Sequence, residues 1–292
     1  MNRKPITNHH LPLTIYHLSF IILLLASCEI INPEEDLPTF IEVNDFQLST
    51  TATQGSDQHQ INDVWAFVGG EPLGIFELPA TIPVLEAGEQ TITLIAGIRD
   101  NGLRSTPAIY PFYDRFETTL SLVPGETTII EPALRYISNS VFELVEDFET
   151  NNLLLSGAIQ RTTNSRQVKE GTGSGSILLT NSEATVQSSF TFLEFPTSGA
   201  LPVYLEMDYK TNVDLEVGLI GLDVSSDPNP FVNYKVILSP INRWNKVYIN
   251  FLEDLTLFPR EGYQLAFRVT NSSNTATPEI LLDNIKLIRF QP

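Results

Sequence analysis

Apolar and polar residues alternate along four stretches in the second half of the chain. Successive side chains of a β-strand point to opposite faces of a sheet, so this alternation predicts strands with one buried and one solvated face. In the first stretch, Val203, Leu205, Met207 and Tyr209 fall on one face, and Tyr204, Glu206, Asp208 and Lys210 fall on the other. The pattern recurs at 213–219, 247–251 and 263–269. Antiparallel strands of this kind, joined by turns, form a β-sandwich.

The first half of the chain is also predicted to consist of strands. Residues 64–68 and 90–96 carry strand-forming side chains, and the pair Gly69 and Gly70 between apolar segments signals a tight turn. No window of eleven residues between 41 and 132 repeats with the period of a capped helix. We therefore expect an all-β protein with two sandwich domains, the first over 39–133 and the second over 138–292.

Residues 1–27 have the layout of a secretory signal, with Arg3 and Lys4 before an apolar run and small residues after it. The apolar run, Leu18 to Ala26, is about half of the roughly twenty residues that a helix needs to cross a bilayer. It closes on Leu25-Ala26-Ser27-Cys28, which resembles the lipobox of bacterial lipoproteins. The resemblance implies cleavage before Cys28, diacylglycerol and palmitate on that residue, and anchoring in the outer membrane. An ordinary secretory signal with a chance cysteine is the alternative.

Residues 28–38 are short and acidic and contain two prolines, which is typical of a tether. Acidic residues directly after the lipidated cysteine resemble the surface-export signals of Bacteroidota lipoproteins. The resemblance implies that the protein faces the outside of the cell. A merely soluble spacer is the alternative.

Composition narrows the classes of function. Cys28 is the only cysteine of the sequence, so no disulfide can form within the chain. The formal net charge is −18, and loss of the signal with Arg3 and Lys4 makes it −20. So acidic a surface repels phosphate backbones, and we exclude nucleic acid as a partner.

Catalytic chemistry finds little support in the sequence. After removal of the signal, His59 is the one histidine left, and it lies in the polar stretch 51–60, which is predicted to be a solvated loop. A histidine-dependent nucleophile and a zinc site of histidines and cysteines therefore lack partners. We predict that the protein is not an enzyme, and a hydrolase with two carboxylates ranks third among the functions considered.

Residues 64–92 are similar to the PEGA-type domain, a small β-sandwich of bacterial surface proteins. A strand at 64–68, a glycine-rich hairpin at 69–74, a proline turn at 78–81 and an acidic glycine turn at 86–92 follow one another in that order. The resemblance implies a spacer or interaction module.

An aromatic segment follows this region. Residues 109–116 contain Tyr110, Phe112, Tyr113 and Phe116. The segment has two interpretations: a platform for a sugar or a protein partner, or a long loop that plugs the open end of the sandwich.

The second domain resembles the jelly-roll carbohydrate-binding modules of the galactose-binding-like type. The segments that carry the resemblance, in order, are Val145–Glu149, Gly173–Leu179, Arg243–Val247 and Ile280–Leu287. The resemblance implies that the first and last strands lie side by side and that Trp244 is in the core.

The same resemblance implies a structural calcium ion between the first and last strands. Carried over to this sequence, its ligands are Glu149 and Asp283, with Asp147 as a weaker third. Asn284 stands where a second Asp is frequent, which lowers the local charge. A hydrogen-bonded acid pair at the strand ends is the alternative.

The solvated faces of the alternating strands indicate a ligand surface. If the four strands share one sheet, their outward side chains form one polar surface suited to a polysaccharide, with aromatic rings to stack and carboxylates and amides to bind hydroxyls. The candidate residues are Tyr204, Glu206, Asp208, Tyr248, Asn250 and Arg268. The sequence thus predicts a non-catalytic envelope lipoprotein that binds glycan. The alternatives are an ordinary hydrated sheet and, for the function, a structural or adhesion component that contacts other envelope proteins.

Overall fold

The computed structural model describes residues 37–180, 182–192, 195, 201–223, 230–270 and 277–291. Over these residues the chain is almost entirely β-strand, which confirms the predicted all-β class. Cys28, the signal segment and the tether up to residue 36 lie outside the described residues. Within the described ranges, no helix is long and apolar enough to cross a membrane.

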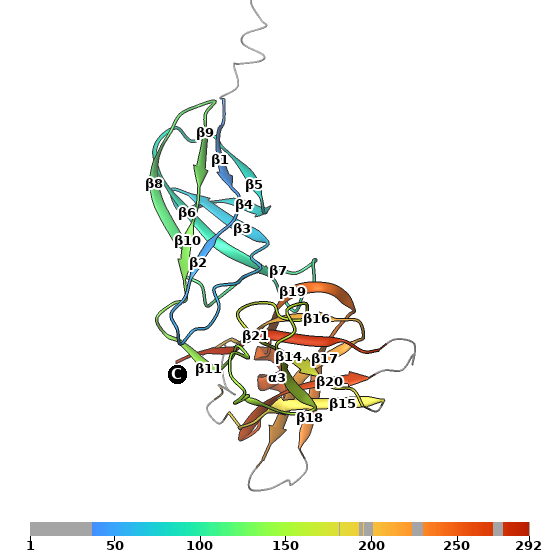
Figure 1. The fold of residues 1–292 in the computed structure, drawn as a ribbon. Helices are drawn as coiled ribbons and strands as arrows, with labels where there is room; N and C mark the ends of the chain where they lie inside the picture. The colour runs from blue at the N-terminus through green and yellow to red at the C-terminus, as the bar shows by residue number, and fades with distance from the viewer. Residues whose placement is uncertain are drawn as a thin grey trace, which may run out of the picture.

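The strands before residue 136 pair with one another and form the first unit (Figure 1). They are β1 (Thr39–Val43), β2 (Gln47–Ser49), β3 (Asp63–Val68), β4 (Glu71–Glu77), β5 (Ala80–Val84), β6 (Gly88–Arg99), β7 (Pro107–Ile109), β8 (Phe116–Leu122), β9 (Thr127–Ile130) and β10 (Ala133–Arg135). One sheet has the order β5-β1-β9, and another has the order β4-β3-β6-β7 with β8 on β6. The short strands β2 and β10 pair in parallel.

The predicted glycine turn joins β3 to β4. Gly69 and Gly70 have φ angles of 58° and 88°, the left-handed region that a two-residue hairpin turn of the primed type requires. The flanking strand presents Val64, Ala66 and Val68 to the buried interior of the unit. Turn chemistry and alternation therefore agree on the same hairpin.

The second unit contains the remaining strands. They are β11 (Ser140–Glu146), β12 (Leu155–Gly157), β13 (Ile159–Thr162), β14 (Ser174–Ile177), β15 (Glu183–Ser188), β16 (Val203–Thr211), β17 (Leu215–Leu222), β18 (Phe231–Leu238), β19 (Ile241–Asn250), β20 (Gly262–Thr270) and β21 (Ile280–Phe290). One short helix, α3 (Leu252–Leu257), follows β19 in the part of the chain that is described.

Two sheets make up this second unit. The joint sheet has the order β13-β14-β21-β16-β19, with β11 paired to β21, and the outer sheet has the order β12-β15-β20-β17-β18. The antiparallel pairing of β11 with β21 confirms that the first and last strands of the second domain lie side by side. The side chains predicted to point inward form the core between the sheets, among them Val203, Leu205, Met207, Leu215, Val217, Val247, Ile249, Leu265 and Phe267.

The four alternating stretches do not share one sheet, which was the condition for a single polar surface. The stretches at 203 and 247 belong to β16 and β19 of the joint sheet, whereas those at 213 and 263 belong to β17 and β20 of the outer sheet. Alternation shows which side of a strand is buried, but it carries no information about which strands are neighbours.

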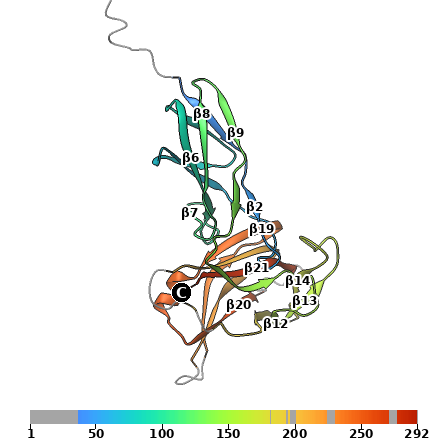
Figure 2. The ribbon, with the colours of Figure 1, turned by 90° about the vertical axis from the view of Figure 1, so that its left-hand side faces the viewer.

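The first unit rests on the joint sheet of the second unit. In Figures 1 and 2, β16, β19 and β21 face the first unit, and the outer sheet lies on the opposite side. Strand β1 begins at the end of the first unit that is remote from the second unit. The arrangement places the outer sheet at the far end of the molecule from the start of β1.

Candidate functional site

The predicted polar surface of the joint sheet is covered by the first unit. Tyr204, Glu206 and Tyr248 are 4%, 0% and 1% exposed, and Asp208 is equally buried. We expected these side chains to meet solvent because alternation placed them opposite the core. The correction has a simple cause: both faces of β16 and of residues 246–249 of β19 are buried, one against the outer sheet and the other against the first unit.

The aromatic segment of the first unit supplies the cover. Tyr110, Phe112 and Tyr113 are buried, and the Tyr110 ring meets the rings of Tyr204 and Tyr248 edge-on at centroid distances of 5.3 and 4.9 Å. The interpretation of this segment as an exposed platform is therefore wrong for these three residues. The segment closes the end of the first sandwich, as the plug interpretation required, and packs on the second unit.

Glu206 is held by tyrosine hydroxyls from the first unit. The Tyr110 hydroxyl donates to Oε1 at 2.6 Å, and the Tyr136 hydroxyl lies 2.9 and 3.0 Å from the two carboxylate oxygens. Burial raises the pKa of both tyrosines well above the usual value, with the Glu206 charge adding to the effect. A buried carboxylate persists in such a place because donors satisfy it.

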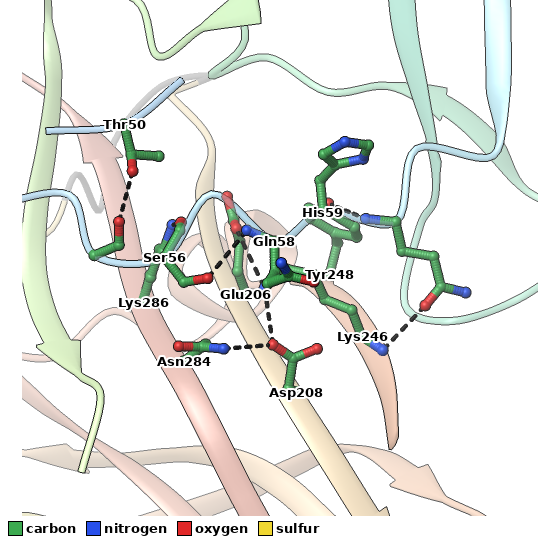
Figure 3. A network of polar contacts seen from close by, with 12 residues as sticks. Thr50, Ser56, Gln58, His59, Glu206, Asp208, Lys246, Tyr248, Asn284 and Lys286 are labelled. Carbon is green, nitrogen blue, oxygen red and sulfur yellow. Dashed lines mark hydrogen bonds and ion pairs between the residues drawn. The ribbon is translucent and has the colours of Figure 1, made fainter. Parts of the chain in front are cut away.

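Two lysines balance the carboxylates of this interface (Figure 3). Lys286 Nζ donates to the Ser56 carbonyl at 2.5 Å and to the Tyr136 hydroxyl at 3.0 Å, so it connects the last strand to two parts of the first unit. Lys246 Nζ lies 3.5 Å from an Asp208 carboxylate oxygen. Burial lowers the pKa of the Lys286 ammonium to about 8, against the opposing effect of Glu206.

The backbone also joins the two units. At the turn after β6, Asn101 N–H donates to the Tyr248 carbonyl at 2.9 Å, and Asn101 Oδ1 accepts from Asn250 N–H at 3.0 Å. Gln60 of the loop 51–60 adds a second connection, from its N–H to the Tyr248 hydroxyl at 3.0 Å. These bonds cover β19, which lies at the edge of the joint sheet. The predicted ligand residues of this sheet thus belong to an intramolecular interface.

Arg268 is the predicted ligand residue that lies elsewhere, on the side of the outer sheet that faces away from the core. We call this surface the outer face. It is formed by Thr185 and Gln187 of β15, Gln264, Ala266 and Arg268 of β20, Glu216, Gly218 and Ile220 of β17, and Val232, Tyr234 and Ile237 of β18. The first unit lies on the opposite side of the second unit from this surface (Figures 1 and 2).

A charged pair and an aromatic ring stand together on the outer face. Arg268 Nε donates to Glu216 Oε1 at 3.0 Å, and its Nη2 pairs with Oε2 of the same carboxylate. The guanidinium carbon lies 4.3 Å from the centroid of the Tyr234 ring. A planar guanidinium held by two bonds and a ring is a fixed recognition group.

Two small residues lie in the middle of the outer face. Gly218 and Ala266 are register partners on neighbouring strands, and Gly218 also opposes Tyr234 at a register shift in β18. A Cβ at Gly218 would lie 1.9 Å from the Asn233 carbonyl oxygen, so this position requires glycine. The amides of Gln187 and Gln264 belong to the same face, and Gln264 Nε2 donates to the Ser188 carbonyl. Two small, buried residues thus lie beside an aromatic and charged stack.

Of the three predicted calcium ligands, Asp147 and Glu149 line the same cavity and Asp283 does not. Asp147 and Glu149 line a cavity of about 410 Å³ between the two units, together with Glu170, Asp57 and Asn284. Glu149 accepts hydrogen bonds from the N–H groups of Thr172 and Gly173 and from the Thr172 hydroxyl, which lower the pKa of Glu149 against its desolvation.

Asp283 does not line this cavity. It is buried and accepts from the Ser174 hydroxyl at 2.6 Å and from Asn284 N–H at 2.9 Å. Burial raises its pKa to about 7. Among the described residues, no three histidine, cysteine, aspartate or glutamate side chains are grouped so that they could hold a metal ion. Calcium binding by Glu149, Asp283 and Asp147 stays a prediction.

Two further expectations differ from the structure. Trp244, expected in the core, is only half-buried and is not part of the core of the second unit. His59, expected on a solvated loop, is half-buried with Nε2 2.9 Å from the Phe46 carbonyl oxygen. The loop lies between the two units, so its polar composition reflects contact with the interface and not only with water.

Sequence reasoning missed Tyr234, the aromatic residue of the outer face. Lys235 is an extra residue in β18 at the register shift, so the strand does not alternate cleanly. Val232 and Tyr234, two residues apart, are the remaining signal of its outward side.

No protein-family model matches the chain, and no curated protein matches it. Among solved structures, the chain is similar to the enzymatically active domain of tailspike protein 4 of bacteriophage CBA120, with 12% identity over 51% of this chain and 19% of that one, at a TM-score of 0.33. It is also similar to the N-terminal xylanase 10B modules of Clostridium thermocellum, with 11% identity, 52% and 28% coverage and a TM-score of 0.39. A xylan-binding domain from Paenibacillus barcinonensis matches with 14% identity, 51% and 99% coverage and a TM-score of 0.37.

Proposed function

We propose that the protein binds glycan, without catalysis, through the outer face of its second unit. The observation that carries this proposal is the stack of Glu216, Arg268 and Tyr234, three side chains that are each partly exposed on the outer face. The first unit covers the joint sheet, so the outer face is the broad sheet surface of the second unit left for a partner.

The chemistry of the outer face suits a ligand rich in hydroxyl groups. Amide and carboxylate oxygens accept hydrogen bonds from hydroxyls, and guanidinium and amide N–H groups donate to them. Gln187, Gln264 and Glu216 provide such groups beside Arg268. The partly exposed Tyr234, next to Ile220 and Val232, provides an apolar surface for the C–H faces of a sugar ring.

The test of this proposal is glycan binding by the full chain with Tyr234→Ala. Without the ring, the guanidinium loses its support and the sugar loses an apolar contact, worth about 0.5 to 1.5 kcal/mol beyond buried area, so we expect at least a severalfold loss of affinity. Isothermal titration against the glycans retained in affinity gels measures it.

Tyr204→Phe is the matched control because Tyr204 lies in the interface and loses only its hydroxyl, which accepts from Asn250 Nδ2 at 3.0 Å. Its affinity should equal that of the parent. Loss of binding in Tyr204→Phe with unchanged binding in Tyr234→Ala would move the site from the outer face to the joint sheet.

A second candidate function is adhesion to other envelope proteins. Val232 and Ile237 on the outer face are 42% and 64% exposed, and apolar side chains of this kind suit a protein partner as well. Absence of binding to every glycan tested would favour this candidate.

The proposed location is the cell surface, with the protein held in the outer membrane by lipid on Cys28 and the acidic tether of residues 28–38 leading into the first unit. The support is the motif Leu25-Ala26-Ser27-Cys28 behind an apolar run. The PEGA-like interpretation of the first unit as a spacer is part of the same proposal. Its hairpin at β3 and β4 agrees with that pattern.

We also propose that calcium is a structural cofactor of this protein. The oxygen-rich cavity beside Asp147 and Glu149 has the donor chemistry of a hard cation. Excess calcium should raise the melting temperature of the full chain if these residues hold it, and an unchanged melting temperature would exclude the site.

A further inference from the structure

The two cations in the strands of the outer sheet are both paired with carboxylates. Within the bounds of β12, β15, β17, β18 and β20, the lysines and arginines are Lys235 and Arg268. Arg268 is held by both oxygens of Glu216. Lys235 Nζ donates to Asp254 of α3 at 2.5 Å, on the side of β18 away from the outer face.

Glu216 thus neutralises the positive charge that Arg268 would otherwise present on the outer face. The guanidinium carbon also lies over the Tyr234 ring, 4.3 Å from its centroid. Glu183 of β15 adds a further negative charge, close enough to influence both Tyr234 and Arg268. Arg268 carries one positive charge and Glu216 and Glu183 carry one negative charge each, so this part of the outer face has a net negative charge.

A negative surface with no unpaired cation discriminates by charge. A uronate or sulfate group brought to the described part of this face meets no free partner and loses its hydration, which is unfavourable without a compensating pair. A neutral hydroxyl still finds the amides of Gln187 and Gln264 and the oxygens of Glu216. The formal net charge of −18 on the chain acts in the same direction.

We propose that the outer face selects uncharged glycans and that Glu216 is the residue that sets this selectivity, by masking the Arg268 guanidinium. This inference rests on the proposed glycan binding and adds the class of ligand. Removal of the Glu216 charge should therefore give the same face affinity for acidic glycans.

The experiment compares the full-length parent chain with Glu216→Gln on two sets of probes. The neutral probes are unsubstituted xylan, mixed-linkage glucan and galactomannan, and the acidic probes are polygalacturonate, alginate and hyaluronate. Affinity gels followed by titration calorimetry are run at 50 mM and at 500 mM sodium chloride. The parent should bind at least one neutral probe and none of the acidic probes, with an affinity that salt changes little.

In Glu216→Gln, affinity for at least one acidic probe should rise by tenfold or more at 50 mM salt, and the rise should shrink at 500 mM. The double variant Glu216→Gln with Arg268→Gln should lose the rise, which shows that the freed guanidinium causes it. Glu143→Gln is the matched control, because Glu143 also pairs with an arginine, Arg289, but on the joint sheet. It should show no gain of acidic binding.

The outcomes distinguish failure of the proposed selectivity from failure of glycan binding itself. Binding of an acidic probe by the parent, as tight as that of any neutral probe, overturns the selectivity and leaves glycan binding intact. Neutral binding by the parent without any acidic gain in a folded Glu216→Gln overturns the role of Glu216. Failure of the parent to bind any probe overturns the proposed function and this inference with it. Circular dichroism and melting curves establish that each variant is folded.

Discussion

At the scale of single residues, the interface depends on charged and phenolic groups that are wholly buried. Glu206 and Lys286 are both 0% exposed, and each is bonded to the Tyr136 hydroxyl. Burial of opposite charges bridged by a hydroxyl stabilises a structure little by itself, because desolvation offsets the attraction, but removal of one charge leaves the other uncompensated. These residues therefore specify how the two units fit together more than they add to the free energy of folding.

The titration of these groups predicts a maximum of stability in alkaline solution. The pKa of Lys286 is lowered to about 8, so between pH 8 and about 10 the folded state sheds a proton that the unfolded lysine retains, and the free energy of unfolding rises with pH. Tyr110, Tyr113, Tyr136, Tyr204 and Tyr248 have raised pKa values. Above about pH 10 the unfolded tyrosines ionise first, and stability falls.

Urea denaturation of the full chain at a series of pH values measures this profile. Lys286→Met should abolish the rise between pH 8 and 10 and keep the fall above pH 10. A parent protein whose stability is flat or falling between pH 8 and 10 would contradict the assignment of the rise to Lys286.

At the scale of elements, the turn after β6 protects an edge strand. The exposed edge of a sheet invites pairing with other chains, and β19 is such an edge in the joint sheet. The Asn101 backbone and side chain occupy this edge from the first unit. Asn101 has a φ angle of 54°, a left-handed conformation that asparagine adopts more readily than most residues.

Asn101→Ala should destabilise the full chain by about 1 to 3 kcal/mol, because it leaves Asn250 N–H without its acceptor and places alanine at positive φ. Asn101→Gly keeps the conformation and loses the side-chain bond, so its cost should be smaller. Chemical denaturation compares the two variants. Equal costs would show that backbone conformation at this turn contributes nothing.

The sequence predicted the individual strands better than it predicted which strands and units pack together. Alternation identified the buried sides of β16, β17, β19 and β20, because the need to bury Val203 or Leu265 acts on each strand separately. It could not show that Tyr204 and Glu206 on the opposite side are buried too. Polar residues with alternating spacing look the same on a solvated face and in an interface where every group has a partner. Tyr234 is not among the predicted ligand residues because a single extra residue, Lys235, breaks the alternation of β18.

At the scale of the whole molecule, the two units form one body joined by a buried contact. The apolar cluster of the first unit includes Tyr204, Tyr248 and Ile288 of the second, so the core of the first unit extends onto the joint sheet. The resemblance to a spacer domain followed by a binding module did not predict that the first unit covers the joint sheet.

Attachment to the membrane is the prediction that belongs to this scale. Cys28→Ala removes the proposed site of lipidation, and the apolar run of residues 18–26 is too short to span a bilayer. We expect the variant to leave the membrane fraction or to remain as an uncleaved precursor, measured by fractionation after a carbonate wash. Equal amounts of processed variant and parent in the washed membranes would contradict lipid anchoring.

The position of β1 determines how the molecule would carry mechanical load. Under the proposed anchoring, a glycan bound at the outer face pulls on one end of the molecule and the lipid holds the other, where β1 begins. Strand β1 is bonded on one side to β5 and on the other to β9, in parallel. Tension along β1 shears both ladders at once, since their hydrogen bonds run across the strand, and none can open singly like a zipper. Under the proposed anchoring and glycan binding, this pairing of β1 would resist traction between a surface polymer and the membrane.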